Sequence, residues 1–247
     1  RICPEVTILA GGPEVSYNSE QILQQNPALD GVFCGEGEEP FLEYMQALHG
    51  KRDLHEVHSL VWRDCDGTIV RNPSAPPLEM AQLPFPYPDL DAVSGKILYF
   101  ESIRGCPFRC SYCLSSVAGK VRYLTLPLVF ERLQRFLDAK VHQVKFVDRT
   151  FNCSKEHTMA IWKYLAEHDN GVTNFHFELT AHLIDQEMID FLSTVRRGLF
   201  QFEIGVQSTN PDTIREIRRT TDTERLLDIC RTLDKPKNIH LHLDLIA

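Results

Sequence analysis

The chain has 247 residues, 43% hydrophobic and 24% charged, which fits one large α/β domain with an appended piece. Its formal net charge of −8 argues against a dedicated nucleic-acid surface, and leaves open only a local basic patch such as Arg215, Arg218 and Arg219. We expect no membrane partner, because no apolar run is long enough to span a bilayer. Eight cysteines without secretory features indicate a reducing, cytoplasmic setting.

The first 55 residues are predicted to alternate between strands and helices. Strands are expected at 6–10 and 31–34, and helices at 19–25 and 40–49. This order is typical of a doubly wound parallel sheet, yet two strands cannot bury such a sheet on both faces. Since the chain also opens with Arg1 rather than Met, we expect it to be a fragment whose earlier strands are missing.

A hairpin and a linker are predicted next, at residues 56–92. Two strand-like runs, 57–63 and 68–72, flank an Asp-Gly turn at Asp66. Six prolines then follow between residues 73 and 91 and indicate extended chain. The predicted domains are therefore 1–55, the hairpin and linker at 56–92, and 93–247.

Three cysteines form a CxxxCxxC motif in a loop: Cys106, Cys110 and Cys113. Thiolates bind iron–sulfur clusters, and a cubane of four irons needs four ligands, so three cysteines leave one iron open for chemistry. Zinc is a weaker interpretation because no fourth Cys or His stands at metal spacing in a second knuckle. Disulfides are disfavoured because one cysteine is left over and no secretory signal is present. The spacing therefore favours a redox-active cluster.

From residue 96 onward, strand and helix patterns alternate. Strands are predicted at 97–103, 143–148, 174–180, 200–206 and 239–246, and helices at 126–139, 155–168, 185–195, 211–218 and 223–233. Serial βα units predict a parallel sheet with right-handed crossovers. Five such strands predict a partial barrel, in which the fifth strand is the last one in this chain.

The last three of these strands alternate apolar and polar residues. The polar series comprises His176, Glu178, Thr180, Gln201, Glu203, Gly205, Gln207, His240, His242 and Asp244. If helices cover the apolar face, the polar face lines the lumen of the barrel. An exposed antiparallel sheet is the alternative, and the intervening helices argue against it.

The cysteine loop resembles that of the radical S-adenosylmethionine (SAM) superfamily. In that family the open iron binds the amino and carboxylate groups of SAM, and the reduced cluster cleaves SAM to a 5'-deoxyadenosyl radical. The resemblance implies a [4Fe-4S] cluster on Cys106, Cys110 and Cys113, SAM as cosubstrate, and an electron donor such as a flavodoxin or ferredoxin. Tyr112, just before the last cysteine, is then expected to lie beside the adenine.

The resemblance also implies contacts to SAM from the barrel. Glu178 and Gln207 stand at or near the carboxyl ends of their strands, the catalytic face of a βα barrel. In relatives with a motif like GVQS at 205–208, residues so placed contact the ribose, which makes Glu178, Gln207 and Ser208 candidates.

Two charged residues complete the predicted SAM site. Arg219 matches in spacing an arginine that pairs with the SAM carboxylate in those relatives, and a guanidinium fork suits that anion. Asp148, in FVDRTFN at 146–152, is a candidate acceptor for the methionyl amine. Neutralisation of Asp148 by Arg149 is an equal alternative.

Two N-terminal motifs resemble the last strand ends of the cobalamin-binding domain that precedes many radical SAM domains: AGGPEVS at 10–16 and GEGEEPF at 35–41. Glycines after a parallel strand let backbone amides approach a ligand, so Gly11 and Gly12 are candidate cobalamin contacts, with ordinary βα turns as the alternative. The histidine motif for the lower ligand would lie upstream of Arg1, so this site is expected to be incomplete.

The predicted fold is thus α/β: a partial TIM-like barrel of the radical SAM type after a C-terminal remnant of a Rossmann-like cobalamin-binding domain. The predicted function is reductive cleavage of SAM, with cobalamin-dependent methyl transfer or rearrangement on a small-molecule or peptide substrate. One alternative is a methylthiotransferase-like enzyme, which would need further cluster cysteines in its N-terminal domain. The other is a noncatalytic iron–sulfur or zinc scaffold, which would lack the residues that bind SAM.

Overall fold

The computed structural model describes residues 3, 5–117 and 119–246. The chain forms two compact units, Arg1–Gln82 and Leu83–Ala247, and each is described by itself. No helix in the described ranges has the length and apolar character needed to cross a membrane.

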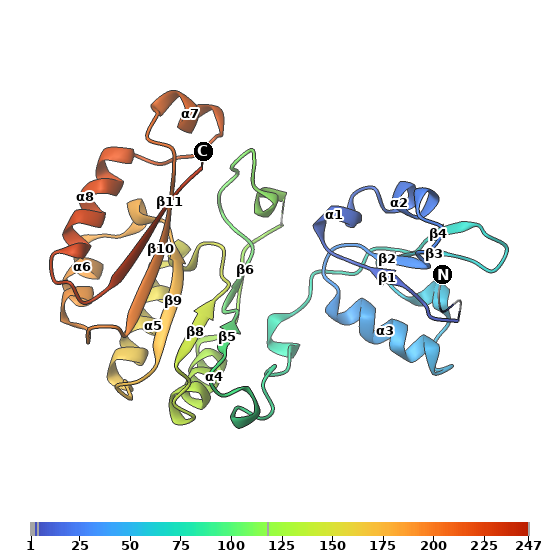
Figure 1. The fold of residues 1–247 in the computed structure, drawn as a ribbon, viewed down its shortest axis with the longest axis horizontal. Coiled ribbons are helices and arrows are strands. Elements are labelled where there is room, and N and C mark those ends of the chain that lie inside the picture. Colours follow the sequence, from blue (N-terminus) through green and yellow to red (C-terminus); the bar gives the residue numbers. More distant parts are fainter. Residues whose placement is uncertain (1–2, 4, 118, 247) are drawn as a thin grey trace. The chain divides into compact units, whose positions relative to one another are not determined.

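The first unit is a four-stranded sheet with helices on both faces (Figure 1). Its strands, in sheet order, are β1 (Leu9–Ala10), β2 (Gly31–Phe33), β3 (Leu60–Arg63) and β4 (Ile69–Arg71). Its helices are α1 (Pro13–Ser16), α2 (Ser19–Gln25) and α3 (Glu38–Leu48). β1 and β2 run parallel, whereas β3 and β4 add antiparallel.

This sheet corrects the predicted boundary between residues 55 and 56. The expected hairpin is β3–β4, but it continues the sheet of β1 and β2 instead of joining a linker. Leu60 and Trp62 pack with Tyr44 of α3, and Val61 packs with Leu23 of α2. β3 thus buries one face against α3 and the other against α2, and so belongs to the same unit as these helices. This unit extends to Gln82.

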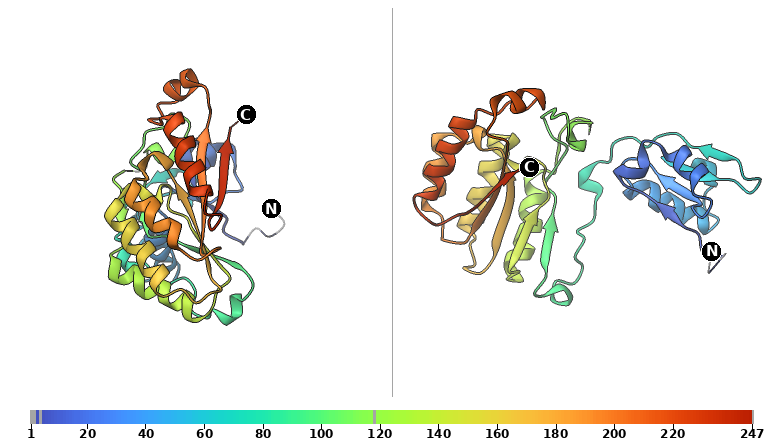
Figure 2. Two further views of the ribbon diagram at one scale, coloured as in Figure 1. Left: turned by 90° about the vertical axis from the view of Figure 1, so that its left-hand side faces the viewer. Right: turned by 45° about the horizontal axis from the view of Figure 1, so that its top comes forward.

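The second unit is a five-stranded, all-parallel sheet in the order β11-β10-β9-β8-β5. The strands are β5 (Ile97–Phe100), β8 (Gln143–Phe146), β9 (Asn174–Leu179), β10 (Phe200–Gln207) and β11 (His240–Leu245). The helices are α4 (Leu126–Asp138), α5 (Lys155–Glu167), α6 (Gln186–Thr194), α7 (Pro211–Glu216) and α8 (Thr223–Asp234). Figure 2 shows helices gathered on one face of this sheet.

Helix starts in the second unit follow capping chemistry. The side chains of Ser154, Asp185 and Asp222 accept backbone N–H groups in the first turns of α5, α6 and α8. Such caps satisfy donors that a helix leaves unpaired at its N-terminus.

The core of the second unit lies between the sheet and its helices, with large aromatic side chains under α5. Trp162 of α5 is fully buried, 5.5 Å from Phe202 and 6.1 Å from Phe200 between ring centroids. Phe175 and Phe177 of β9 are also fully buried. The alternation in β9 and β10 thus turns the apolar residues toward the helices, as the sequence predicts.

A short antiparallel pair closes the base of the cysteine loop: β6 (Ile103–Arg104) and β7 (Arg122–Tyr123). The strand predicted at 97–103 is therefore two strands, β5 and β6. The chain departs from the parallel ladder because the backbone N–H groups of Ser102 and Ile103 bind the carboxylate of Asp148.

Candidate functional site

The three cysteines of the loop line one pocket at the carboxyl ends of the parallel strands. Cys110 is buried, and Cys106 and Cys113 are half-buried; all three thiols are free. Among the described residues, no group of three or more His, Cys, Asp or Glu side chains is placed so that it could hold one metal ion. Three thiols around a common cavity fit a cluster, whose separate irons each take one thiolate, better than one ion.

Asp148 is fully buried and holds the backbone just before the cysteine loop. Its Oδ1 accepts the backbone N–H of Ser102 at 2.8 Å and of Ile103 at 3.0 Å, and its Oδ2 accepts the Ser102 hydroxyl. Burial raises the pKa of Asp148 to about 7, partly opposed by these hydrogen bonds. Asp148 is not among the pocket-lining residues, and its carboxylate binds the backbone at the root of the loop. Its contact with the methionyl amine stays a prediction.

Arg219 connects the cysteine loop to β10. Its Nη1 donates to the Tyr112 hydroxyl at 3.4 Å, its Nη2 to the carbonyl oxygen of Gly205 at 2.6 Å, and its Nε to Thr221 at 3.0 Å. Burial raises the pKa of Tyr112, and the nearby Arg219 charge opposes that shift. Arg219 and Tyr112 both line the pocket.

Gln207 ends β10 in a left-handed backbone conformation, with φ of 67°. The register of β10 against β11 shifts between Gly205 and Gln207. The Gln207 amide folds back over Gly205, so that a Cβ at Gly205 would lie 2.2 Å from Gln207 Nε2. A glycine at 205 therefore makes room for the amide inside the pocket.

The lumen face carries a charged cluster next to these groups. Lys145 Nζ of β8 lies 3.1 Å from Glu203 and 3.7 Å from Glu178. Burial lowers the pKa of Lys145, but the two carboxylates outweigh it and the net shift is upward. His176 Nε2 lies 3.1 Å from Glu203 Oε2, without the geometry of a hydrogen bond. The polar residues of neighbouring strands thus share one face, as their alternation predicts.

The predicted SAM-site residues fall into two groups. Tyr112, Glu178, Gln207 and Arg219 line the same pocket as the three cysteines. Ser208 is not in that lining; its hydroxyl accepts the backbone N–H of Asn210 at 3.2 Å, just before α7.

Gly11 and Gly12 belong to the first unit and follow β1. Gly12 has φ of 97° and precedes α1. The backbone conformation thus accounts for a glycine at this position. Cobalamin contacts by Gly11 and Gly12 stay a prediction.

Several lining residues were not predicted as SAM ligands: Phe108, Ser115, Arg149, Thr150, Leu179, Thr180, Glu203, Gly205 and Asp244. The lumen positions of Glu203, Gly205 and Asp244 were available from strand alternation. Arg149 and Thr150 directly follow Asp148, so their position just past a parallel strand was the available signal.

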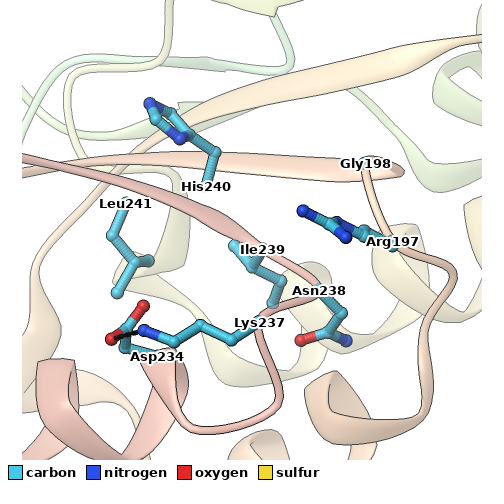
Figure 3. Close-up of a pocket in the computed structure, with 8 residues that line it drawn as sticks. All are labelled: Arg197, Gly198, Asp234, Lys237, Asn238, Ile239, His240 and Leu241. Atoms are coloured by element: carbon cyan, nitrogen blue, oxygen red, sulfur yellow. Dashed lines mark hydrogen bonds and ion pairs between the residues drawn. The ribbon is translucent and has the colours of Figure 1, made fainter.

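A second pocket lies at the opposite, amino-terminal ends of β10 and β11 (Figure 3). Here Lys237 pairs with Asp234, and Asn238 Nδ2 donates to the carbonyl oxygens of Leu192 at 2.8 Å and Val195 at 3.0 Å. These contacts hold the turn before β11, so the polar groups of this pocket serve the fold. We therefore assign the chemistry to the cysteine-lined pocket.

Comparisons with known proteins agree with this geometry. Residues 100–237 match the family model of the Radical SAM superfamily. The chain is 25% identical over 283 residues to cytidylyl-2-hydroxyethylphosphonate methyltransferase of Streptomyces wedmorensis, covering 98% of this chain and 52% of that protein. It is 26% identical over 251 residues to the anaerobic magnesium-protoporphyrin IX monomethyl ester cyclase of Synechocystis sp., covering 93% of this chain and 48% of that protein.

A solved structure shares the fold. The cobalamin-dependent S-adenosylmethionine radical enzyme OxsB, with aqua-cobalamin and S-adenosylmethionine bound, superposes with a TM-score of 0.77 at 20% identity, over 97% of this chain and 36% of that one. The α/β fold with a parallel sheet of the partial-barrel type is thereby confirmed. The chain spans about half the length of the curated relatives it matches.

Proposed function

Because the chain belongs to the radical SAM superfamily, we propose that Cys106, Cys110 and Cys113 hold a [4Fe-4S] cluster and that the adjoining pocket binds SAM. One observation carries this proposal: the three thiols line the same pocket as Tyr112 and Arg219. When bound, a cluster of this kind supplies the electron that cleaves SAM to methionine and a 5'-deoxyadenosyl radical. Members of the superfamily need a reductant, and we propose a flavodoxin or ferredoxin for this role.

Arg219 is suited to bind the SAM carboxylate. A guanidinium has five N–H groups, and the bonds to Tyr112, Gly205 and Thr221 use one on each nitrogen. Within the described residues this leaves one N–H on each of Nη1 and Nη2. Two such donors match the two oxygens of a carboxylate.

Polar groups on β9 and β10 are suited to the ribose. The Glu178 carboxylate and the Gln207 amide enter the pocket from neighbouring strands. A carboxylate accepts hydrogen bonds from hydroxyl groups, and an amide can both accept and donate them. We assign the ribose hydroxyls to these two residues and the adenine to the ring of Tyr112.

For the reaction that follows, we propose cobalamin-dependent methyl transfer or rearrangement on a small-molecule or peptide substrate. The support is similarity to a methyltransferase and a cyclase and the fold shared with a cobalamin-dependent enzyme. The Gly11–Gly12 turn after β1 is the candidate cobalamin contact within the first unit. A noncatalytic scaffold is less favoured because it has no need for the pocket formed by Glu178, Gln207 and Arg219.

Anaerobic reconstitution tests the cluster. We expect about four irons per chain in the wild type and loss of this iron when Cys106, Cys110 and Cys113 become alanine. Cys65→Ala is the matched control, because this exposed cysteine lies in the first unit. Reduction in the presence of SAM should then yield 5'-deoxyadenosine. Zinc at full occupancy with no iron uptake would contradict the proposal.

A further inference from the structure

Thr150 brings a buried hydroxyl to the first cysteine of the loop. Its Oγ1 lies 3.4 Å from Cys106 Sγ, and the residue is only 3% exposed. Thr150 lies past the end of β8 and lines the same pocket as Cys106. The contact therefore joins the end of a barrel strand to a cysteine that we assign to the cluster.

The two sides of this contact are both anchored. Asp148 holds the backbone of Ser102 and Ile103 just before the cysteine loop. On the other side, Asn152 exchanges two hydrogen bonds with the backbone of Thr180 at the end of β9, each 2.9 Å long. Asp148 and Asn152 lie two residues before and two residues after Thr150, and both are bound in this way. The Thr150 hydroxyl therefore has a defined position relative to Cys106.

The direction of the hydrogen bond follows from its proton. The Thr150 hydroxyl donates to the carbonyl oxygen of Arg149 at 2.8 Å. Its single proton is thus in use, and the Cys106 thiol is the donor in the Cys106–Thr150 contact. A sulfur that is bound to iron carries no proton and can only accept. Keeping the contact then requires the Thr150 hydroxyl to rotate away from Arg149 and donate to sulfur.

We propose that Thr150 is a positioning residue that donates an O–H···S hydrogen bond to iron-bound Cys106 and thereby raises the reduction potential of the cluster. Hydrogen bonds to ligand sulfurs stabilise the reduced cluster, which carries the additional negative charge. Through this bond, Thr150 influences how readily the cluster takes up the electron that SAM cleavage needs. The inference rests on the proposed function, because it requires the cluster on Cys106.

The test compares midpoint potentials of the reconstituted full chain, measured by redox titration with electron paramagnetic resonance of the reduced cluster. Thr150→Val keeps the volume and removes the hydroxyl, so we expect a shift to a more negative potential and an altered spectrum. Thr150→Ser keeps the hydroxyl and should restore the wild-type potential. Thr158→Val is the matched control, since this buried hydroxyl bonds only to the carbonyl oxygens of Phe151 and Ser154 in the described residues.

The outcomes separate this inference from the proposed function. Full cluster content with the same potential in wild type and Thr150→Val would overturn the role of Thr150 alone. No cluster in the wild type would overturn both proposals. If Thr150→Val takes up too little iron, Thr150→Ala makes the same comparison with a smaller side chain. Loss of the cluster in both variants, with Thr158→Val intact, would overturn potential tuning in favour of a role in assembly.

Discussion

Arg219 is the residue at which the cysteine loop and the barrel meet. Its bonds to Tyr112 and Gly205 hold the guanidinium in the pocket before any ligand arrives. A side chain that is already ordered loses less conformational entropy when it binds an anion.

Arg219→Ala is expected to weaken SAM binding by about 1.5–3 kcal/mol, the usual contribution of a hydrogen bond to a charged group. The iron content should stay at the wild-type level, because Arg219 is not a thiolate ligand. Isothermal titration of the reconstituted protein with SAM measures the affinity. Arg215→Ala is the control, since Arg215 is 78% exposed and pairs with Asp212. Equal SAM affinity in wild type and Arg219→Ala would remove Arg219 from the site.

Asp148 makes folding stability depend on pH. Its pKa is raised to about 7 in the folded chain by burial, whereas an unfolded aspartate titrates near 3.9. Between these values the unfolded chain releases the proton and the folded chain keeps it. The free energy of unfolding therefore falls as pH rises from about 4 to about 7 and is constant, for this group, outside that window.

Asp148→Asn should remove this part of the pH dependence. The amide oxygen can accept both backbone N–H groups that Oδ1 now accepts, and the amide nitrogen can donate to Ser102 Oγ. Urea unfolding followed by Trp162 fluorescence, in a Trp62→Phe background, measures the effect at about pH 5 and about pH 8. We expect wild type to lose more stability than the variant over this interval. Asp212→Asn, at an exposed position, controls for net charge, and identical pH dependence in wild type and Asp148→Asn would refute the argument.

At the scale of elements, α5 holds the sheet of the second unit together. Trp162 contacts aromatic rings from β9 and β10, and also Phe151 in the turn before α5. Its indole N–H has no hydrogen-bond partner in the described residues. The side chain therefore stabilises the unit by packing.

Trp162→Ala should lower the free energy of unfolding of the second unit by about 3–5 kcal/mol, the usual cost of removing a large buried aromatic side chain. Urea unfolding followed by circular dichroism measures it. Lys163→Ala changes an exposed neighbour on the same helix and should alter stability by less than about 0.5 kcal/mol. A small effect of Trp162→Ala would mean that the core closes around the vacated space.

The elements that the sequence predicts well have a strong periodic pattern. Helix 19–25 and strands 174–180 and 200–206 agree with α2, β9 and β10 to within a residue at each end, because burial of one face imposes period 2 or 3.6 on the side chains. The short pair β6–β7 has two residues in each strand, too few for any period to appear. The pairing of β3 with β2 is a tertiary contact that local patterns do not encode.

The same limit applies to the candidate site. The spacing of Cys106, Cys110 and Cys113 is enough to make them candidates, whereas Gln207 and Arg219 become candidates only through resemblance; all five line one pocket. The sequence placed Asp148 correctly at the end of a strand but could not give the direction of its side chain, which turns inward to Ser102. The sequence does not single out Thr150, because its contact with Cys106 spans 44 positions.

At the scale of the whole molecule, the first unit has its own core and a sheet with one parallel pair, β1 and β2. Doubly wound sheets bind ligands at the carboxyl ends of several parallel strands. β3 runs antiparallel to both β2 and β4. The hairpin therefore adds no further pair of adjacent parallel strands.

We therefore expect the 247-residue chain to bind cobalamin weakly or not at all, and a version extended at its N-terminus with further parallel strands to bind it. Equilibrium dialysis with aqua-cobalamin measures both affinities. Tight stoichiometric binding by the 247-residue chain would show that its two parallel strands suffice. Absence of binding by the extended version would show that the domain keeps the fold without the cofactor.

The strand order of the second unit has a consequence for how it is made. Each strand pairs with the one before it in the sheet series, β8 on β5, β9 on β8, β10 on β9 and β11 on β10. A chain that leaves the ribosome from its N-terminus therefore always presents the next strand with a template that has already been synthesised. Ribosomes add roughly 5–20 residues per second, much more slowly than loops close. The second unit can thus grow by one βα unit at a time during synthesis, with the thiols of the loop in place before the last strands of their pocket emerge.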